Sequence, residues 1–115
     1  MSKEEGPVTL AEFEELVLLA VLRSEGEAYG APLQRDLAER AKRSVSVSTV
    51  YVTLIRLEDK GFLTSRKGHP TAERGGKAKR LFEATPDGVE ALRATRAVRD
   101  RMWDGVELPD PARER

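Results

Sequence analysis

The chain has 115 residues, of which 39% are hydrophobic and 35% charged, so it can form one small domain with a highly charged surface. The absence of cysteine excludes disulfides, thiolate nucleophiles and cysteine metal sites, and no apolar run is long enough to span a membrane. Lys plus Arg equals Asp plus Glu at 20 each, so net charge by itself does not decide for or against a nucleic-acid partner. We therefore expect a soluble cytoplasmic protein. A core this small is often completed by a partner subunit, which favours a dimer.

A first helix is expected after a flexible polar leader, residues 1–8. Thr9 and Glu12 have the spacing of a capping box, in which each side chain bonds a free N–H near the helix start. The helix should continue to about Ser24, and from Leu16 onward it is apolar nearly all round. A helix of this kind must be covered on more than one side. We expect one face in the core and another against a partner.

A second helix is expected to begin near Pro32, because proline is favoured in a first helical turn. It should end near Ala41. A short connection then leads to a third helix, whose N-cap is Ser46 or Ser48.

The third helix carries the most informative pattern in the chain. One set of apolar side chains recurs at three- and four-residue steps and predicts a buried stripe: Val47, Val50, Leu54 and Leu57. The opposite face is small, hydroxylated and basic, with no carboxylate before Asp59: Ser48, Thr49, Val52, Thr53, Arg56 and Lys60. A helix with such a face can enter the major groove of DNA and hydrogen-bond to base edges.

A β-hairpin is expected directly after this helix. Gly61 is placed to end the helix in the left-handed conformation, and two strands, 62–67 and 77–84, flank a loop rich in Gly and Pro. Thr85 can then cap the last helix, with Pro86 at its first position. The predicted fold class is mainly α with a small β-hairpin, a winged helix-turn-helix with three N-terminal helices, a two-stranded wing and a C-terminal helix.

Charge is distributed unevenly along the chain. Residues 40–80 carry eleven basic and three acidic side chains, a net charge of +8, and the remainder carries −8. Such a block is commonly a solvated surface, but beside the predicted third helix it favours a polyanionic partner. We therefore divide the chain into a winged-helix DNA-binding domain at 1–84, a dimerisation helix at 85–107 and a flexible tail at 108–115.

Several short motifs occur together in this order: Tyr29-Gly30; Ser48-Thr49-Val50-Tyr51; Arg56-Leu57-Glu58; Gly61-Phe62-Leu63; the segment 74–80; and Ala84-Thr85-Pro86-Asp87-Gly88. With them, over roughly residues 9–106, the sequence resembles the PadR family of winged-helix transcriptional regulators. The usual family pattern has glycine at position 48 and proline at position 52, where this chain has Ser48 and Val52. These two departures affect the expected base preference and local helix geometry, and they leave the expected fold unchanged.

The resemblance implies a dimeric regulator, usually a repressor, with the third helix in the major groove and the wing on the backbone or minor groove. It also implies dimerisation through the last helix, often packed against the partner's first helix. Similar short sequences are often encoded beside membrane transporter genes, which suggests a transporter operon as the target. The expected partners are double-stranded DNA and a second copy of the chain, with no membrane, metal or cofactor.

The candidate DNA-binding residues lie on the third helix and the wing. Thr49, Thr53 and Arg56 are the best candidates for contacts to base edges. Tyr51 either donates its hydroxyl to a phosphate or packs between the helix and the wing, and the sequence leaves both alternatives open. The whole predicted set is Ser48, Thr49, Tyr51, Thr53, Arg56, Lys60, Arg66, Lys67, Arg74, Lys77, Lys79 and Arg80.

The candidate dimer interface draws on the first and last helices: Leu16, Leu19, Leu92, Val98, Met102, Trp103 and Val106. Trp103, the only tryptophan, is expected to pack there, although it could also stack on an aromatic ligand at the same interface. Whether a small-molecule effector exists is left open. His69, the only histidine, reads as a solvent-facing loop residue.

Three other interpretations compete with that of a PadR-like regulator: an enzyme, a protein-interaction module and a MarR-like repressor. The sequence shows no nucleophile–base pair, phosphate loop, paired-carboxylate cleft or metal cluster, so an enzyme is not expected. A winged helix used for protein–protein contact should have an acidic or apolar third-helix face, whereas this one is basic. A MarR-like repressor normally has a longer chain. We therefore predict a homodimeric, sequence-specific transcriptional regulator, with the protein-interaction module as the alternative.

Overall fold

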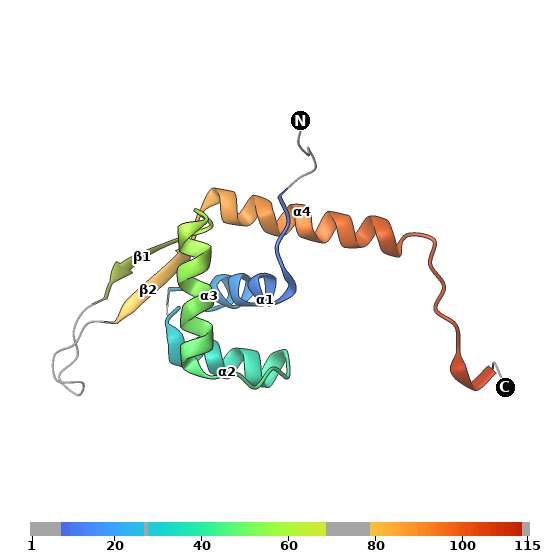
Figure 1. Ribbon diagram of the computed structural model, residues 1–115, viewed down its shortest axis with the longest axis horizontal. Helices are drawn as coiled ribbons and strands as arrows, with labels where there is room; N and C mark the ends of the chain where they lie inside the picture. The colour runs from blue at the N-terminus through green and yellow to red at the C-terminus, as the bar shows by residue number, and fades with distance from the viewer. Residues whose placement is uncertain (1–7, 27, 69–78, 114–115) are drawn as a thin grey trace.

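The computed structural model describes residues 8–26, 28–68 and 79–113, in which three helices precede a two-stranded wing and a long fourth helix (Figure 1). The elements in chain order are α1 (Glu12–Arg23), α2 (Gly30–Arg40), α3 (Val47–Asp59), β1 (Leu63–Lys67), β2 (Arg80–Ala84), α4 (Pro86–Trp103) and the short 3₁₀ helix η2 (Pro111–Arg113). This order confirms the predicted winged helix-turn-helix fold.

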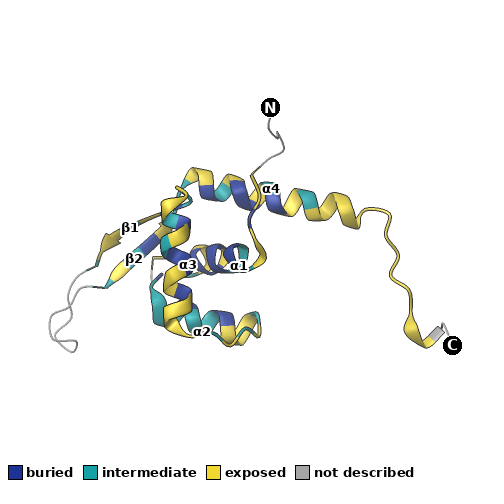
Figure 2. Ribbon diagram, viewed as in Figure 1, coloured by how far each residue is buried: buried dark blue, intermediate teal, exposed yellow. Residues whose placement is uncertain are grey.

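The core lies where α1, α2 and α3 meet the two strands and the first half of α4, and the inner faces of these elements are buried (Figure 2). Its most deeply buried large side chains are Val17, Leu18, Leu33, Val50, Leu54, Leu57 and Phe82. The predicted apolar stripe of α3 is therefore confirmed for three of its four residues. The prediction for Val47 is wrong, because its side chain is 41% exposed. Val47 is the first residue of α3 and lies at the edge of the domain, beside Gly30.

Three helix ends are formed as the sequence predicts. Ser46 Oγ accepts a hydrogen bond from the Thr49 N–H at 3.1 Å, and Thr85 Oγ1 accepts one from the Gly88 N–H at 3.0 Å. Gly61 has a φ of 84°, and the next N–H donates back into the last turn of α3, the arrangement of a Schellman C-cap.

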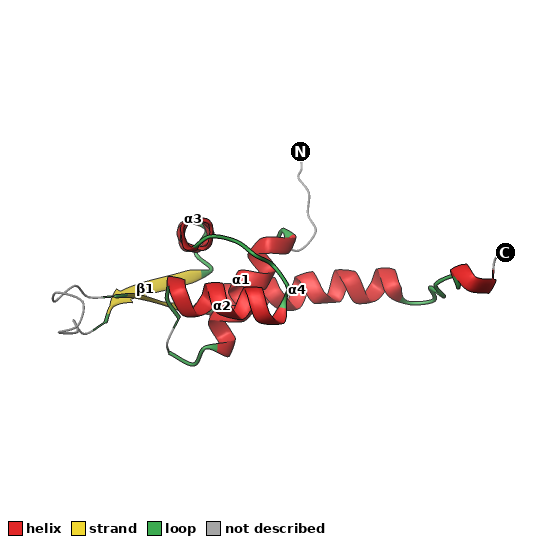
Figure 3. Ribbon diagram, turned by 90° about the horizontal axis from the view of Figure 1, so that it is seen from below, coloured by secondary structure: helices red, strands yellow, loops and turns green. Residues whose placement is uncertain are grey.

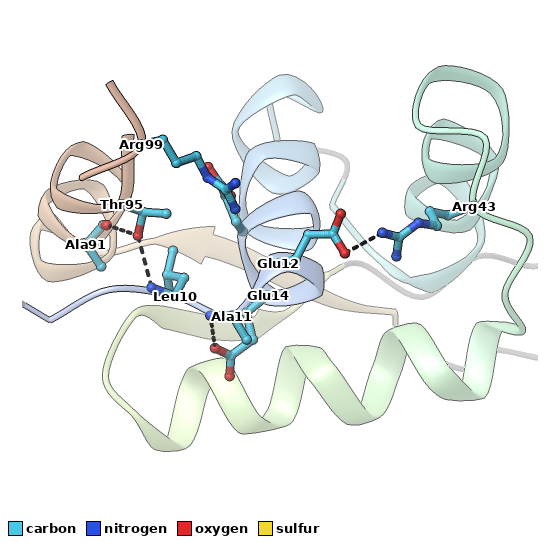
Figure 4. A network of polar contacts seen from close by, with 9 residues as sticks. Leu10, Ala11, Glu12, Glu14, Arg43, Ala91, Thr95 and Arg99 are labelled. Atoms are coloured by element: carbon cyan, nitrogen blue, oxygen red, sulfur yellow. Dashed lines mark hydrogen bonds and ion pairs between the residues drawn. The ribbon is translucent and has the colours of Figure 1, made fainter. Parts of the chain in front are cut away.

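The start of α1 differs from the prediction. The N-cap is Ala11, and Glu14 Oε1 accepts its N–H at 3.1 Å, so Thr9 and Glu12 do not form the capping box. The reason is a long-range contact: the Leu10 N–H donates to Thr95 Oγ1 of α4 at 2.9 Å (Figure 4). This bond ties the segment before α1 to α4 where the two cross (Figure 1).

The wing and the end of α4 project in opposite directions from the helical body, and α3 lies at the outer edge of the molecule (Figures 1 and 3). Strands β1 and β2 pair antiparallel, from Leu63 opposite Ala84 to Lys67 opposite Arg80. The first predicted strand begins one residue later than expected, at Leu63. The wing loop, with the predicted residues His69, Arg74 and Lys77, lies outside the described residues. No helix in the described ranges is long and apolar enough to cross a membrane.

Candidate nucleic-acid interface

The outer face of α3 is a stripe of exposed side chains spaced three and four residues apart. Ser48, Thr49, Val52 and Arg56 are exposed, and they line a shallow groove together with Phe13 of α1 and the buried Thr53. The exposed side chains of α3 in this groove therefore offer two hydroxyl groups, one apolar side chain and one guanidinium. These groups can contact base edges, a thymine methyl group and guanine, respectively.

Thr53 is not part of the exposed stripe. Its side chain is buried, with an exposure of 4%, because position 53 follows the buried Val50 by three residues and adjoins the buried Leu54. Thr53 is therefore buried and not exposed as predicted, although it lines the same groove. A contact from Thr53 to a DNA base stays a prediction.

Tyr51 packs between α3 and the wing. Its ring meets the buried Phe82 ring edge to face, with the centroids 6.2 Å apart and an angle of 79° between the planes. Its hydroxyl accepts a hydrogen bond from Arg80 Nη1 at 3.2 Å. Of the two alternatives for Tyr51, the structure shows packing. A phosphate contact by this residue stays a prediction.

Two of the predicted phosphate-binding cations are engaged in ion pairs within the chain. Arg80 Nη2 lies 2.9 Å from Glu58 Oε1, and Lys60 Nζ lies 2.6 Å from Glu14 Oε2. Sequence reasoning did not identify either carboxylate as a partner. Glu58 directly follows Arg56-Leu57, so the sequence does show an acid on the predicted third helix that a wing cation could pair with. The contact between Lys60 and Glu14 has no signal in the sequence.

Glu14 is a buried carboxylate of α1 that contacts Lys60 at the C-terminal end of α3. Burial by itself would raise the pKa of Glu14. Hydrogen bonds from Lys60 Nζ and the Ala11 N–H, together with the charges of Lys60 and Arg56, outweigh burial and hold the pKa of Glu14 below its usual value. Lys60, at the C-terminal end of α3, is thereby bonded to the first turn of α1.

The remaining described wing cations have different surroundings. Arg66 and Lys67 are exposed on β1, where no ion pair involves them among the described residues. Lys79 Nζ lies 4.6 Å from the centroid of the Tyr29 ring, a cation–π contact. Among the described cations of the wing, Arg66 and Lys67 are therefore the two exposed ones without an ion pair, and their predicted phosphate contacts stay predictions.

The predicted dimer residues fall into three environments. Leu92 is 9% exposed and belongs to the core of the protomer, so it offers little surface to a partner. Leu16 and Val98 are half-buried, and Leu19 is exposed. The other three, Met102, Trp103 and Val106, lie together at and just beyond the end of α4. Leu108, which was not predicted from the sequence, lies with them. These apolar side chains are 51–72% exposed.

No group of three or more potential metal-ligating side chains occurs in the part of the chain that the structure describes. The site is thus built from hydroxyls, cations and apolar side chains on α3 and the wing. Its chemistry suits the recognition of a polyanion with hydrogen-bonding edges.

Comparison with known proteins places this geometry in a family. The model of the Transcriptional regulator PadR-like family matches residues 18–94. The transcriptional regulator Rv3488 of Mycobacterium tuberculosis is 35% identical over 79 residues, which are 69% of each chain. A PadR-like transcription factor from Bacteroides fragilis superposes with a TM-score of 0.67 at 23% identity, over 80% of this chain and 84% of that one.

A further solved structure is that of Bacillus subtilis PadR in complex with operator DNA. It matches with a TM-score of 0.54 at 22% identity, over 84% of this chain and 50% of that one. This likeness shows the shared winged-helix fold. The match to the family model and the similarity to Rv3488 confirm the resemblance found in the sequence. The chain belongs to the PadR-like family of transcriptional regulators.

Proposed function

We propose that this protein is a sequence-specific DNA-binding regulator that represses transcription as a homodimer. The observation that carries the proposal is the exposed stripe of α3, with the hydroxyls of Ser48 and Thr49 and the guanidinium of Arg56. Among the described residues Arg56 has no ion-pair partner within 4 Å, so its donors are available to a ligand. The operator-bound structure of Bacillus subtilis PadR supports the use of this fold on DNA.

The proposed complex places α3 in the major groove and the wing along the backbone. Arg66 and Lys67 would meet phosphates, while Arg56 and Thr49 would meet base edges. The exposed apolar end of α4 supports the proposal of a dimer, since a second copy would cover Met102 and Trp103. Two α3 helices related by a two-fold axis read half-sites about one helical turn apart, so the operator should be a pseudo-palindrome.

The test is fluorescence anisotropy of the purified protein over a salt series. Two duplexes are used: one from the region upstream of the gene that encodes this protein, and one selected from a random library. Each is compared with a scrambled version of its sequence. Tighter binding to one natural or selected duplex, with a steep salt slope, is the expected result. The position of that duplex in the genome also tests the predicted transporter operon, and reporter expression in its presence tests repression.

Equal, weak and salt-sensitive binding to all duplexes would contradict sequence-specific recognition. No binding at low salt would contradict the DNA proposal altogether. That result would favour a winged helix used for protein–protein contact.

A further inference from the structure

The guanidinium of Arg80 on β2 joins three elements of the fold. Its Nε donates to Ser65 Oγ of β1 at 3.0 Å, its Nη1 to the Tyr51 hydroxyl of α3 at 3.2 Å, and its Nη2 to Glu58 Oε1 of α3 at 2.9 Å. The second oxygen of Glu58 accepts a hydrogen bond from Ser65 Oγ at 2.6 Å. Arg80, Ser65 and Glu58 therefore form a closed ring of hydrogen bonds between the wing and α3, and Tyr51 is joined to this ring through Arg80.

Aromatic packing lies directly beneath this ring. The Arg80 Cζ atom is 5.6 Å from the centroid of the Phe82 ring, and Phe82 is 1% exposed. The aromatic ring of Phe82 also meets the ring of Tyr51 edge to face. Arg80 thus covers the aromatic contact by which the wing packs on α3.

We propose that Arg80 serves DNA recognition as a positioning residue: with Glu58 as its partner, it fixes the angle of the wing on α3 and does not contact phosphate. This inference rests on the proposed function. All three guanidinium nitrogens are already bonded within the chain, and the Glu58 carboxylate compensates the charge. Because α3 and the wing must meet one duplex together, their relative angle decides whether both can bind at once.

The effect of neutralising Glu58 on DNA affinity distinguishes a positioning role from simple charge repulsion. A carboxylate near bound DNA ordinarily weakens binding by repulsion, so replacing it with a neutral group should strengthen binding. If Glu58 instead holds Arg80 in place, its neutralisation weakens binding to the preferred duplex. Asp59 provides a matched control, because it is the next residue of α3, is exposed and has no ion pair among the described residues.

A positioning role of Arg80 can be distinguished from a phosphate contact, because the first depends on the shape of the side chain and the second mainly on its charge. Lysine keeps the positive charge but lacks the planar fork that bonds three acceptors at once. A phosphate contact would tolerate Arg80→Lys, whereas a positioning role would not. Arg66 on β1 is the matched control, since it is exposed on the same hairpin without an ion pair among the described residues.

The experiment measures the Kd of the wild-type protein, Arg80→Gln, Arg80→Lys and Glu58→Gln on the selected duplex and its scrambled form, over a salt series. Arg66→Gln and Asp59→Asn are measured in parallel, and circular dichroism verifies that each variant is folded. All three test variants should bind the selected duplex at least about fivefold more weakly. Their salt slopes should be unchanged, whereas Arg66→Gln should lower the slope by about 1.

The inference is overturned if Arg80→Lys binds like the wild type, if Arg80→Gln lowers the salt slope by about 1, or if Glu58→Gln binds as tightly as Asp59→Asn. Should Arg80→Gln fail to fold, Arg80→Lys and the isosteric Glu58→Gln still decide the question. Failure of the wild-type protein to prefer any duplex contradicts the proposed function itself. Normal wild-type preference with any of the three outcomes above contradicts this inference alone.

Discussion

Lys60 Nζ, at the C-terminal end of α3, lies 2.6 Å from Oε2 of Glu14 in the first turn of α1. The Glu14 side chain is 8% exposed, whereas that of Lys60 is 47% exposed. The pair therefore consists of a buried acid and a cation that reaches it from the surface. It joins the helix proposed to read DNA to the helix that precedes it by two elements. A cation that sequence reasoning assigned to a phosphate has a structural partner here.

Replacement of Glu14 by Gln should reduce stability in a pH-dependent way. The folded-state pKa of Glu14 lies below its usual value of 4.5, so its contribution is present above pH 4.5 and is lost as the pH falls through the folded-state pKa. At pH 7 we expect Glu14→Gln to lower the free energy of unfolding by about 1–2 kcal/mol. Urea unfolding at a series of pH values should show the wild type and the variant converging in acid.

Glu39 supplies the control for that measurement, because it is exposed on α2 and has no ion pair among the described residues. Glu39→Gln should leave the free energy of unfolding nearly unchanged at every pH. A constant gap between Glu14→Gln and the wild type down to strongly acid pH would contradict the assigned role of the Glu14 charge.

Removal of the Arg56 guanidinium should reduce sequence preference more than general affinity. A bidentate contact between arginine and guanine is worth about 1–3 kcal/mol of discrimination, so Arg56→Ala should weaken binding to the selected duplex by that amount. Binding to scrambled DNA should change less. Arg93→Ala, an exposed arginine on α4, is the matched control and should change neither affinity. Equal weakening on both duplexes would assign Arg56 to the phosphate backbone.

Two threonines that line the groove on α3 test whether exposure decides which hydroxyl contacts DNA. Thr49 is exposed, and its hydroxyl accepts a hydrogen bond from Ser46 Oγ at 3.0 Å, whereas Thr53 is buried. Thr49→Val should weaken binding to the selected duplex severalfold by removing a hydroxyl from the groove-facing stripe. Thr53→Val should leave DNA binding unchanged and shift the free energy of unfolding by less than about 1 kcal/mol. Anisotropy and urea unfolding measure the two effects, and the reverse ranking on DNA would contradict the assignment.

Trp103 should report and stabilise the proposed dimer. It is 58% exposed at the end of α4 and is the only tryptophan, so its emission should shift to the red as dilution separates the subunits. Trp103→Ala should raise the dimer Kd by at least about thirtyfold, equivalent to about 2 kcal/mol. Analytical ultracentrifugation measures this constant, with Arg101→Ala in the same helical turn as the control. A Trp103→Ala protein that dimerises like the wild type would place the interface elsewhere.

Three of the helix ends were predictable from the sequence because their contacts are local. The Ser46 and Thr85 caps bond an N–H three residues away, and the left-handed Gly61 closes the turn just before it. Such bonds need only the right residue type at the right spacing. The buried stripe of α3 followed from periodicity for the same reason. The likeness of these motifs to the PadR family was confirmed over residues 18–94.

Tertiary structure alone decided which charged and polar groups are engaged within the chain. The bonded pairs lie far apart in the sequence: Glu14 and Lys60 by 46 residues, Arg80 and Glu58 by 22, and Leu10 and Thr95 by 85. No local spacing pattern therefore predicts these contacts. The burial of Thr53 likewise depends on the angle at which α3 packs on its neighbours. Residue type and periodicity determine which side chains can bind DNA, but the packing of the folded chain determines which of them are already bound to another residue.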